Sequence, residues 1–126
     1  MMTYSISDFK VGDLVWFCHI SFTPSGRIKN NIKPKQVLIK EVNKNYVKLD
    51  FSGMFMWGVP EYYYIPDHSV SLEEKEDYEI RTDLNIHISK TKEGSIRNYN
   101  TLLKYYVDKR FKEFQKFEKT VQRLLI

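Results

Sequence analysis

Residues able to do metal or covalent chemistry are few in this chain and poorly spaced for it. The three histidines, His19, His68 and His87, are far apart in the sequence, and no two have the separation of a metal-ligand pair. The single cysteine, Cys18, precedes His19 in an apolar run, so in a strand the two side chains point to opposite faces. The sequence therefore predicts no metal site.

Other catalytic arrangements are also missing. A nucleophile needs a base and an orienting acid within reach, and no motif of that kind surrounds Cys18. The carboxylates of residues 73–77 are neighbours in a polar run, which is typical of a solvated face. The segment PSGRIKN lacks the glycines and the Lys-Ser/Thr pair of a phosphate-binding loop. We expect a non-catalytic protein without a cofactor.

Cations form the clearest pattern, and they lie on the last segment of the chain. Residues 96–126 contain no Gly or Pro and repeat with the period of an α-helix. Five cations fall within about 80° of one another on one side of this helix, with Tyr105 among them: Lys109, Lys112, Lys116, Lys119 and Arg123. Such a row can follow a phosphate backbone without reading bases. The alternative is the solvated back of a helix that packs on a sheet.

Four more cations extend this candidate nucleic-acid-binding surface. They lie in residues 23–35, which hold two prolines, a glycine and two asparagines and are expected to form a long exposed loop. These cations are Arg27, Lys29, Lys33 and Lys35.

The opposite side of the predicted helix is apolar. It carries Leu103, Val107, Phe111, Phe114, Phe117, Val121, Leu124 and Leu125. A helix of roughly 30 residues rises about 45 Å, whereas a 60-residue domain is about 25 Å across. The domain cannot cover the whole apolar stripe, so we expect a partner to bury residues 114–125. A second copy of the chain satisfies this with one self-complementary patch; the groove of a different protein is the other candidate.

Aromatic residues are concentrated in GMFMWGVPEYYY, residues 53–64. Alternation along a strand buries some of these rings in a core, but three consecutive tyrosines cannot all point inward. At least one of Tyr62, Tyr63 and Tyr64 is expected at the surface. Together with Trp16 or Phe17 they are candidates for an exposed aromatic ledge that contacts another protein.

The elements that position these residues form an α+β fold. Strands are predicted at residues 13–20, 36–42 and 46–51, the last two as a hairpin, and a turn is expected at Gly53. Residues 67–77 are acidic, either a linker or a short helix capped by Ser71, and another strand is expected within 78–91. The long helix is expected to begin after a cap at Ser95. We divide the chain into a sheet domain (1–66), an acidic connector (67–95) and a helix (96–126).

Two short motifs carry a resemblance to a known class of domain. FKVGDLVWF, residues 9–17, resembles the opening of small β-barrels of the Src-homology-3 and Tudor type. WGVPEYYYI, residues 57–65, is similar to the closing stretch of Src-homology-3 barrels. The resemblance covers the first half of the chain and implies a small bent antiparallel sheet or a five-stranded barrel.

Composition narrows the class of protein. The formal charge is +4 with a pI near 9.1, and neither a signal peptide nor a run of about 18 apolar residues is visible. With its single cysteine, the chain is expected to be soluble, cytoplasmic and not inserted in a membrane. Alanine is absent while Lys, Asn, Ile and Tyr are abundant, which suggests an AT-rich source such as a phage or mobile element.

Two functions follow from these patterns. The first is a homodimeric module that binds nucleic acid through the basic helix face and the loop. The second is a phage or mobile-element inhibitor or adaptor, which binds a host protein through the aromatic ledge and the apolar stripe of the helix.

Overall fold

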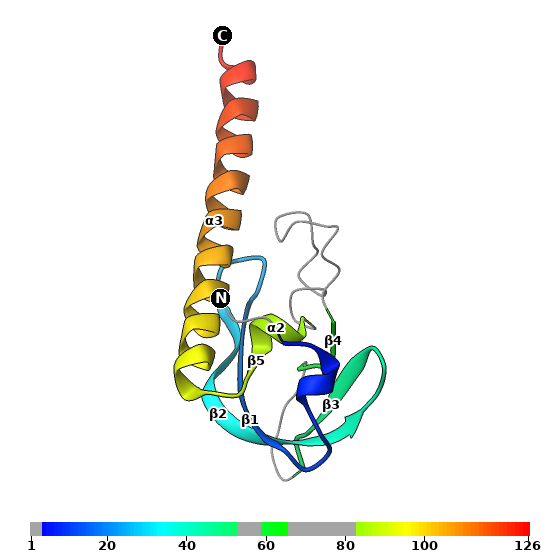
Figure 1. The fold of residues 1–126 in the computed structure, drawn as a ribbon. Coiled ribbons are helices and arrows are strands. Elements are labelled where there is room, and N and C mark those ends of the chain that lie inside the picture. The colour runs from blue at the N-terminus through cyan, green and yellow to red at the C-terminus, as the bar shows by residue number, and fades with distance from the viewer. Residues whose placement is uncertain (1–3, 53–58, 66–82) are drawn as a thin grey trace.

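A computed structural model of the chain describes residues 4–52, 59–65 and 83–126. In these residues a 3-10 turn, η1 (Ile6–Asp8), precedes the strands β1 (Leu14–Phe22), β2 (Ile28–Val42), β3 (Tyr46–Asp50) and β4 (Tyr62–Tyr64). A helical turn α2 (Leu84–His87), a short strand β5 (Ile88–Ser89) and a long helix α3 (Lys92–Leu124) follow. Figure 1 shows α3 rising from a curved sheet. The predicted α+β class is confirmed.

The described strands form one antiparallel sheet in the order β4-β3-β2-β1-β5. β4 and β5 are its edges, and the sheet does not close into a barrel, so the barrel alternative was wrong. β5 is only two residues long and pairs with Trp16 and Phe17 alone. Closure requires strands long enough to continue the ladder around the ring, and these edge strands are too short.

The central strand β1 separates two apolar clusters because its side chains alternate between faces. Val15 and Phe17 belong to the larger cluster, which β2, β3 and β4 complete on the concave face. Cys18 and Ile20 belong to a smaller cluster on the opposite face, where α3 packs with Leu102 and Tyr106. The predicted opposite orientation of Cys18 and His19 agrees with this arrangement.

Residues 23–35 are not the long loop that their composition predicted. The chain turns over Thr23–Arg27 and enters β2 at Ile28, which pairs with β1 as far as Phe22. Gly26 has φ 87°, a conformation that favours glycine in this turn. Pro34 falls at a register shift between β1 and β2, where a missing N–H is tolerated. β1 and β2 therefore extend as a two-stranded arm beyond β3.

The predicted hairpin of residues 36–42 and 46–51 is present as β2 and β3. The strand predicted within 78–91 is found only as β5 in the described part of that range, residues 83–91. Asp83 caps α2, accepting a hydrogen bond from the Asn85 N–H at 2.8 Å, so Leu84–His87 form a helical turn where the alternation of Ile86 and Ile88 predicted a strand. The predicted Gly53 turn and the short helix capped by Ser71 lie outside the described residues.

Helix α3 begins at Lys92, earlier than expected, and its cap is Thr91 rather than Ser95. The Thr91 hydroxyl accepts from the Gly94 N–H at 3.1 Å. Gly94 allows close approach of this first turn to β5, because a Cβ there would overlap the hydroxyl and Cβ of Ser89. Ser95 is instead buried against the sheet.

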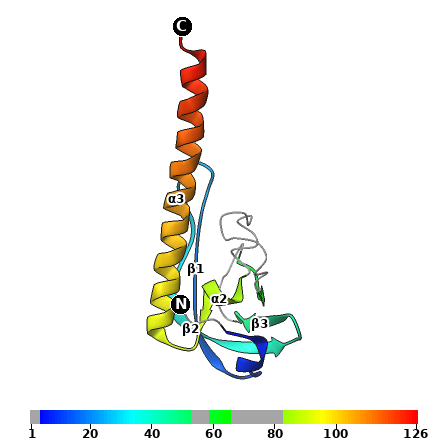
Figure 2. The same ribbon diagram turned by 45° about the horizontal axis from the view of Figure 1, so that its top comes forward.

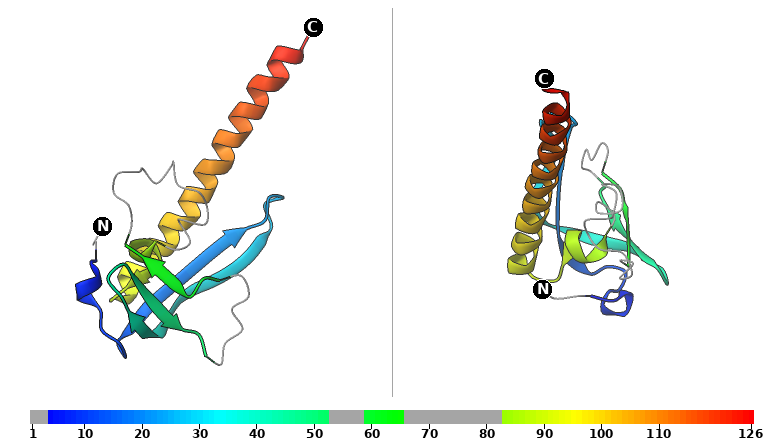
Figure 3. Two further views of the ribbon diagram at one scale, coloured as in Figure 1. Left: turned by 90° about the vertical axis from the view of Figure 1, so that its right-hand side faces the viewer. Right: turned by 90° about the horizontal axis from the view of Figure 1, so that it is seen from above.

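Only the first half of α3 is packed against the sheet. Its buried residues are Ser95, Asn98, Leu102 and Tyr106, and every residue from Arg110 onward is exposed. The arm runs beside this half, and Tyr99 donates a hydrogen bond to Asn31 of β2. Figures 2 and 3 show the second half projecting past the arm with no described element beside it. Within the described residues, no helix has the length and apolarity to cross a membrane.

Candidate nucleic-acid interface

The projecting half of α3 carries the predicted cations on one side. Lys112, Lys116, Lys119 and Arg123 are exposed, whereas Lys109 is half-buried at the level of the arm. At 1.5 Å per residue, the four exposed cations extend over about 16 Å of the helix. Tyr105 is half-buried and packs edge-on against Tyr106 at 5.4 Å, so it belongs to the base of the helix rather than to its projecting surface. We call Lys109, Lys112, Lys116, Lys119 and Arg123 the basic face.

The arm carries the other four predicted cations. Arg27, Lys29 and Lys33 are exposed and Lys35 is half-buried, all on the turn or on β2. Since Asn31 lies beside Tyr99 and the turn lies at the level of Arg110, the arm runs along α3 as far as Arg110. Arg110 lies about 140° around the helix from the centre of the basic face, so these contacts do not join the arm cations to that face. Lys33 and Lys35 lie further back, towards the sheet.

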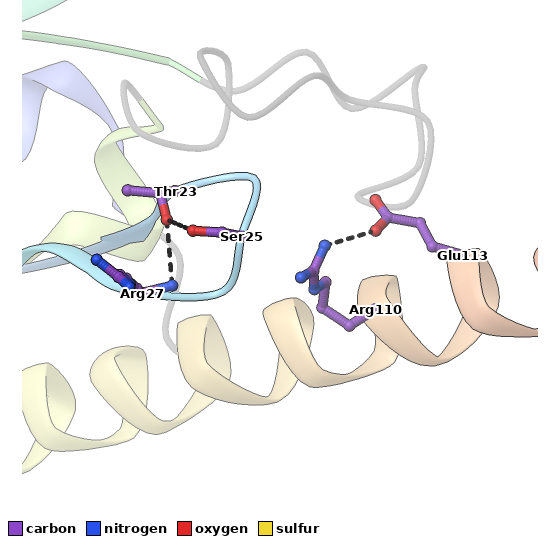
Figure 4. A network of polar contacts seen from close by, with 5 residues as sticks. All are labelled: Thr23, Ser25, Arg27, Arg110 and Glu113. Atoms are coloured by element: carbon purple, nitrogen blue, oxygen red, sulfur yellow. Dashed lines mark hydrogen bonds and ion pairs between the residues drawn. The ribbon is translucent and has the colours of Figure 1, made fainter.

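Acidic residues border the basic face. Glu113 accepts a hydrogen bond from Arg110 at 3.2 Å, as Figure 4 shows, and so forms an ion pair within the helix. Arg110 faces the turn, because a Cβ on Gly26 would lie 3.3 Å from its guanidinium. Asp108 is exposed near the start of the face. Three cations of the basic face, Lys116, Lys119 and Arg123, lie beyond both of these acidic residues.

The apolar stripe is exposed along the projecting half. Phe114 is 60% exposed, Phe117 65% and Leu124 75%. The other exposed members are Val107, Phe111, Val121 and Leu125, while Leu103 is half-buried beside the smaller cluster. The stripe lies about 100° around the helix from the face that packs on the sheet and about 170° from the basic face. Sheet packing, stripe and basic face thus occupy three separate sides of α3.

A groove of about 860 Å³ opens between the stripe and the turn of the arm. Its apolar lining comes from Phe22 and Pro24 on the arm and from Leu103, Tyr106 and Val107 on the helix. Within the turn, the Thr23 hydroxyl accepts from the Arg27 N–H at 3.1 Å and lies 2.9 Å from the Ser25 hydroxyl. No sequence pattern indicated this groove, because it depends on how far the arm reaches along α3.

The predicted aromatic ledge is only partly at the surface. Tyr62 and Tyr64 are exposed, but Tyr63 is fully buried and packs edge-on against Phe17 at 5.5 Å, so its assignment to the ledge was wrong. The cause is the strand alternation of β4, which places Tyr63 opposite Val47 in the core. Trp16 is half-buried, with the Lys92 ammonium 5.8 Å from its ring centre.

Tyr46 completes the ledge, although the sequence analysis did not include it. Its ring lies 5.1 Å from that of Tyr62 and 5.6 Å from that of Tyr64. Partial burial and the nearby Glu41 carboxylate raise the pKa of the Tyr46 hydroxyl. The Lys48 ammonium lies 5.0 Å from the centre of the Tyr62 ring, and hydrogen bonding to Tyr62 raises the pKa of that lysine. Two carboxylates, Glu41 and Glu61, lie beside the single ammonium of Lys48, so the surroundings of the ledge carry a slight negative charge.

The fold brings two distant histidines together inside the core. The ring centres of His19 and His87 are 5.4 Å apart, both side chains are fully buried, and His87 Nδ1 lies 3.0 Å from the Cys18 carbonyl. Burial raises the pKa of the Cys18 thiol to about 12, so this group is a poor nucleophile. No three potential ligands among His, Cys, Asp and Glu of the described residues lie close enough to hold a metal ion.

Comparison of the chain with models of protein families, with curated proteins and with solved structures finds no match. The likeness to Src-homology-3 and Tudor domains therefore stays a prediction from two short motifs.

Proposed function

We propose that this chain is a non-catalytic, cytoplasmic nucleic-acid-binding protein that contacts phosphate backbones through the basic face and works as a homodimer joined by the apolar stripe. The observation that carries the proposal is the position of Lys112, Lys116, Lys119 and Arg123. All four are exposed on the part of α3 that stands clear of the described sheet.

The spacing of these cations suits a phosphate backbone. Successive members are three or four residues apart, so they follow one another at about 4.5–6 Å along the helix. Duplex DNA carries one charge per about 1.7 Å of its axis, so a row of this length passes several phosphates. Contacts to phosphates position a protein but carry no base information, which predicts binding without sequence preference.

Burial of the stripe is compatible with this function. Because the stripe and the basic face lie about 170° apart on α3, a second helix can cover the stripe while the cations stay in water. Exposed apolar surface of this extent marks an interaction site.

The ledge of Tyr46, Tyr62 and Tyr64 favours a second candidate function. Exposed aromatic rings are enriched in protein interfaces, and the ledge and the stripe together suit a phage or mobile-element inhibitor or adaptor that binds a host protein. Such an interface is stabilised mainly by apolar burial and keeps its affinity when salt is added. Phosphate binding weakens steeply with salt.

Fluorescence anisotropy of labelled duplex and single-stranded oligonucleotides tests the first function. The variant Lys112→Glu, Lys116→Glu, Lys119→Glu is expected to abolish binding to every oligonucleotide sequence at low salt. Surface changes of this kind alter stability by less than about 0.5 kcal/mol each, and circular dichroism checks that the fold is retained.

A matched control changes the same charge elsewhere. Lys10, Lys40 and Lys44 are exposed on the sheet domain, and replacing all three by Glu is expected to leave most of the binding intact. Equal losses in the two variants would mean that net charge, not the basic face, is responsible. If the unmutated protein does not bind oligonucleotides at low salt, nucleic-acid binding is refuted and the second function, binding of a host protein, is favoured.

A further inference from the structure

We infer that two copies of the chain pair their α3 helices antiparallel, so that Leu124 of each copy enters the groove between the arm and α3 of the other. This inference rests on the proposed self-association through the stripe, but not on nucleic-acid binding. It assigns an occupant to the groove and an orientation to the pair.

Residues of the stripe, together with Arg110, have the spacing of a coiled-coil seam. Its core positions alternate at spacings of four and three residues over three heptads: Leu103, Val107, Arg110, Phe114, Phe117, Val121 and Leu124. In heptad notation, Val107, Phe114 and Val121 are a positions, and the remaining four are d positions. Every residue of the seam is apolar except Arg110, which is exposed and paired with Glu113.

Antiparallel pairing gives a consistent set of layers along this seam. In that orientation each a position packs against a d position of the other helix. If the pair is centred between Phe114 and Phe117, Phe114 of each copy packs against Phe117 of the other copy. The same register places Val107 against the partner's Leu124, and Arg110 against the partner's Val121. Arg110 can then keep its ion pair with Glu113 at the edge of the interface.

Parallel pairing in register brings like charges together. Each core residue would then face its own copy, so Arg110 would lie against the partner's Arg110 inside the seam. The positions that flank the seam would bring Glu113 next to the partner's Glu118, because g and e positions five residues apart meet in parallel coiled coils. Like charges in contact at an interface oppose association, and the antiparallel register has Thr120 of the partner beside Glu113 instead.

The groove lies at the position that the partner's Leu124 occupies in the antiparallel register. Val107 forms part of the groove wall, together with Phe22 and Pro24 of the arm. The partner's Leu124, placed against Val107, therefore falls within reach of the apolar lining. In the parallel register Leu124 lies far from both grooves, and no residue of the seam fills them.

The exposed apolar area is enough for a stable pair. The exposed fractions of Val107, Phe111, Phe114, Phe117, Val121, Leu124 and Leu125 correspond to roughly 800 Å² per chain, the amount that each partner buries in a standard-size interface. Both basic faces then point away from the seam, on opposite sides of the pair.

Cysteine cross-linking in the full chain tests the orientation without any nucleic acid. The single variants Val107→Cys and Leu124→Cys are oxidised alone and as an equimolar mixture. In the antiparallel pair, two copies of the same position lie about 25 Å apart along the helices. We expect at least about tenfold more cross-linked dimer in the mixture than in either variant alone, because only there do two thiols meet.

Two controls accompany this test. The unmutated protein has only the buried Cys18, and Lys116→Cys places a thiol on the basic face, away from the seam; neither is expected to cross-link. Light scattering of the unmutated protein should report about twice 15.1 kDa. A monomer at tens of micromolar would overturn the self-association, and efficient cross-linking of each variant with itself would overturn the antiparallel orientation. Oligonucleotide binding is measured separately and can succeed or fail independently of both.

Discussion

The salt dependence of oligonucleotide binding follows quantitatively from the basic face. Lys112, Lys116, Lys119 and Arg123 are the exposed cations beyond the arm. If each neutralises one phosphate of a duplex, the slope of log K against log salt is about −3.6, since each contact contributes about −0.9. Raising the salt from about 50 to about 200 mM then weakens binding by roughly 150-fold.

The variant Lys112→Glu, Lys116→Glu, Lys119→Glu leaves one of these four cations. Its slope is expected near −0.9, and the same change in salt should weaken any residual binding only about 3.5-fold. The assay is an anisotropy titration of one labelled duplex at four or five salt concentrations. The Lys10, Lys40, Lys44 control should keep a slope close to that of the unmutated protein.

Two outcomes would refute this reasoning. A slope near zero for the unmutated protein would mean that binding releases no counterions, and hence that the basic face does not contact phosphates. The same slope in the triple variant and in the unmutated protein would assign the contacts to other cations, with those of the arm, Arg27, Lys29 and Lys33, as the next to test.

Because the antiparallel pair has two outward basic faces, it should bind two duplexes at once and so retain a free labelled duplex on beads that carry another duplex. The variant Phe114→Glu should lose this bridging but still bind a single duplex. Bridging by a monomeric variant would contradict the geometry. Gly94→Ala should destabilise the fold by about 1–3 kcal/mol, because the added Cβ overlaps Ser89, even though alanine favours helix; a raised melting temperature would show that Ser89 moves aside easily. Burial raises the pKa of Cys18 from 9.0 to about 12, so iodoacetamide should label it slowly at pH 8 unless the chain is unfolded. As the pH rises above 9, the unfolded thiol ionises first, so this group's contribution to stability should fall; rapid labelling of the folded protein would contradict the burial.

The elements with strong local periodicity were predictable from sequence. The β2–β3 hairpin follows from two alternating runs around a polar turn, and most of α3 follows from the helical repeat of residues 96–126, which contain no Gly or Pro. The excess length of the stripe was also predictable, because helix rise and domain size are both fixed by residue number. Local composition failed at residues 28–35, where polar residues form a strand because β1 supplies the hydrogen-bonding partner.

The candidate site was predictable in part. The helical period alone placed Lys112, Lys116, Lys119 and Arg123 on one side, since angular position depends only on sequence separation. It could not indicate where the sheet stops covering α3, and therefore which of these cations stand clear of the arm. For the same reason Tyr105 and Lys109 were expected at the surface but are half-buried.

Tertiary structure alone decided which distant residues meet. Tyr63 is buried while its neighbours are exposed because the β3–β4 register places it opposite Val47. His19 and His87, separated by about half of the chain, lie side by side in the core only because β5, which follows His87, pairs beside β1. The groove beside Val107 exists because the arm extends as far as Arg110. Each depends on pairing between segments far apart in the chain, which a local periodicity does not encode.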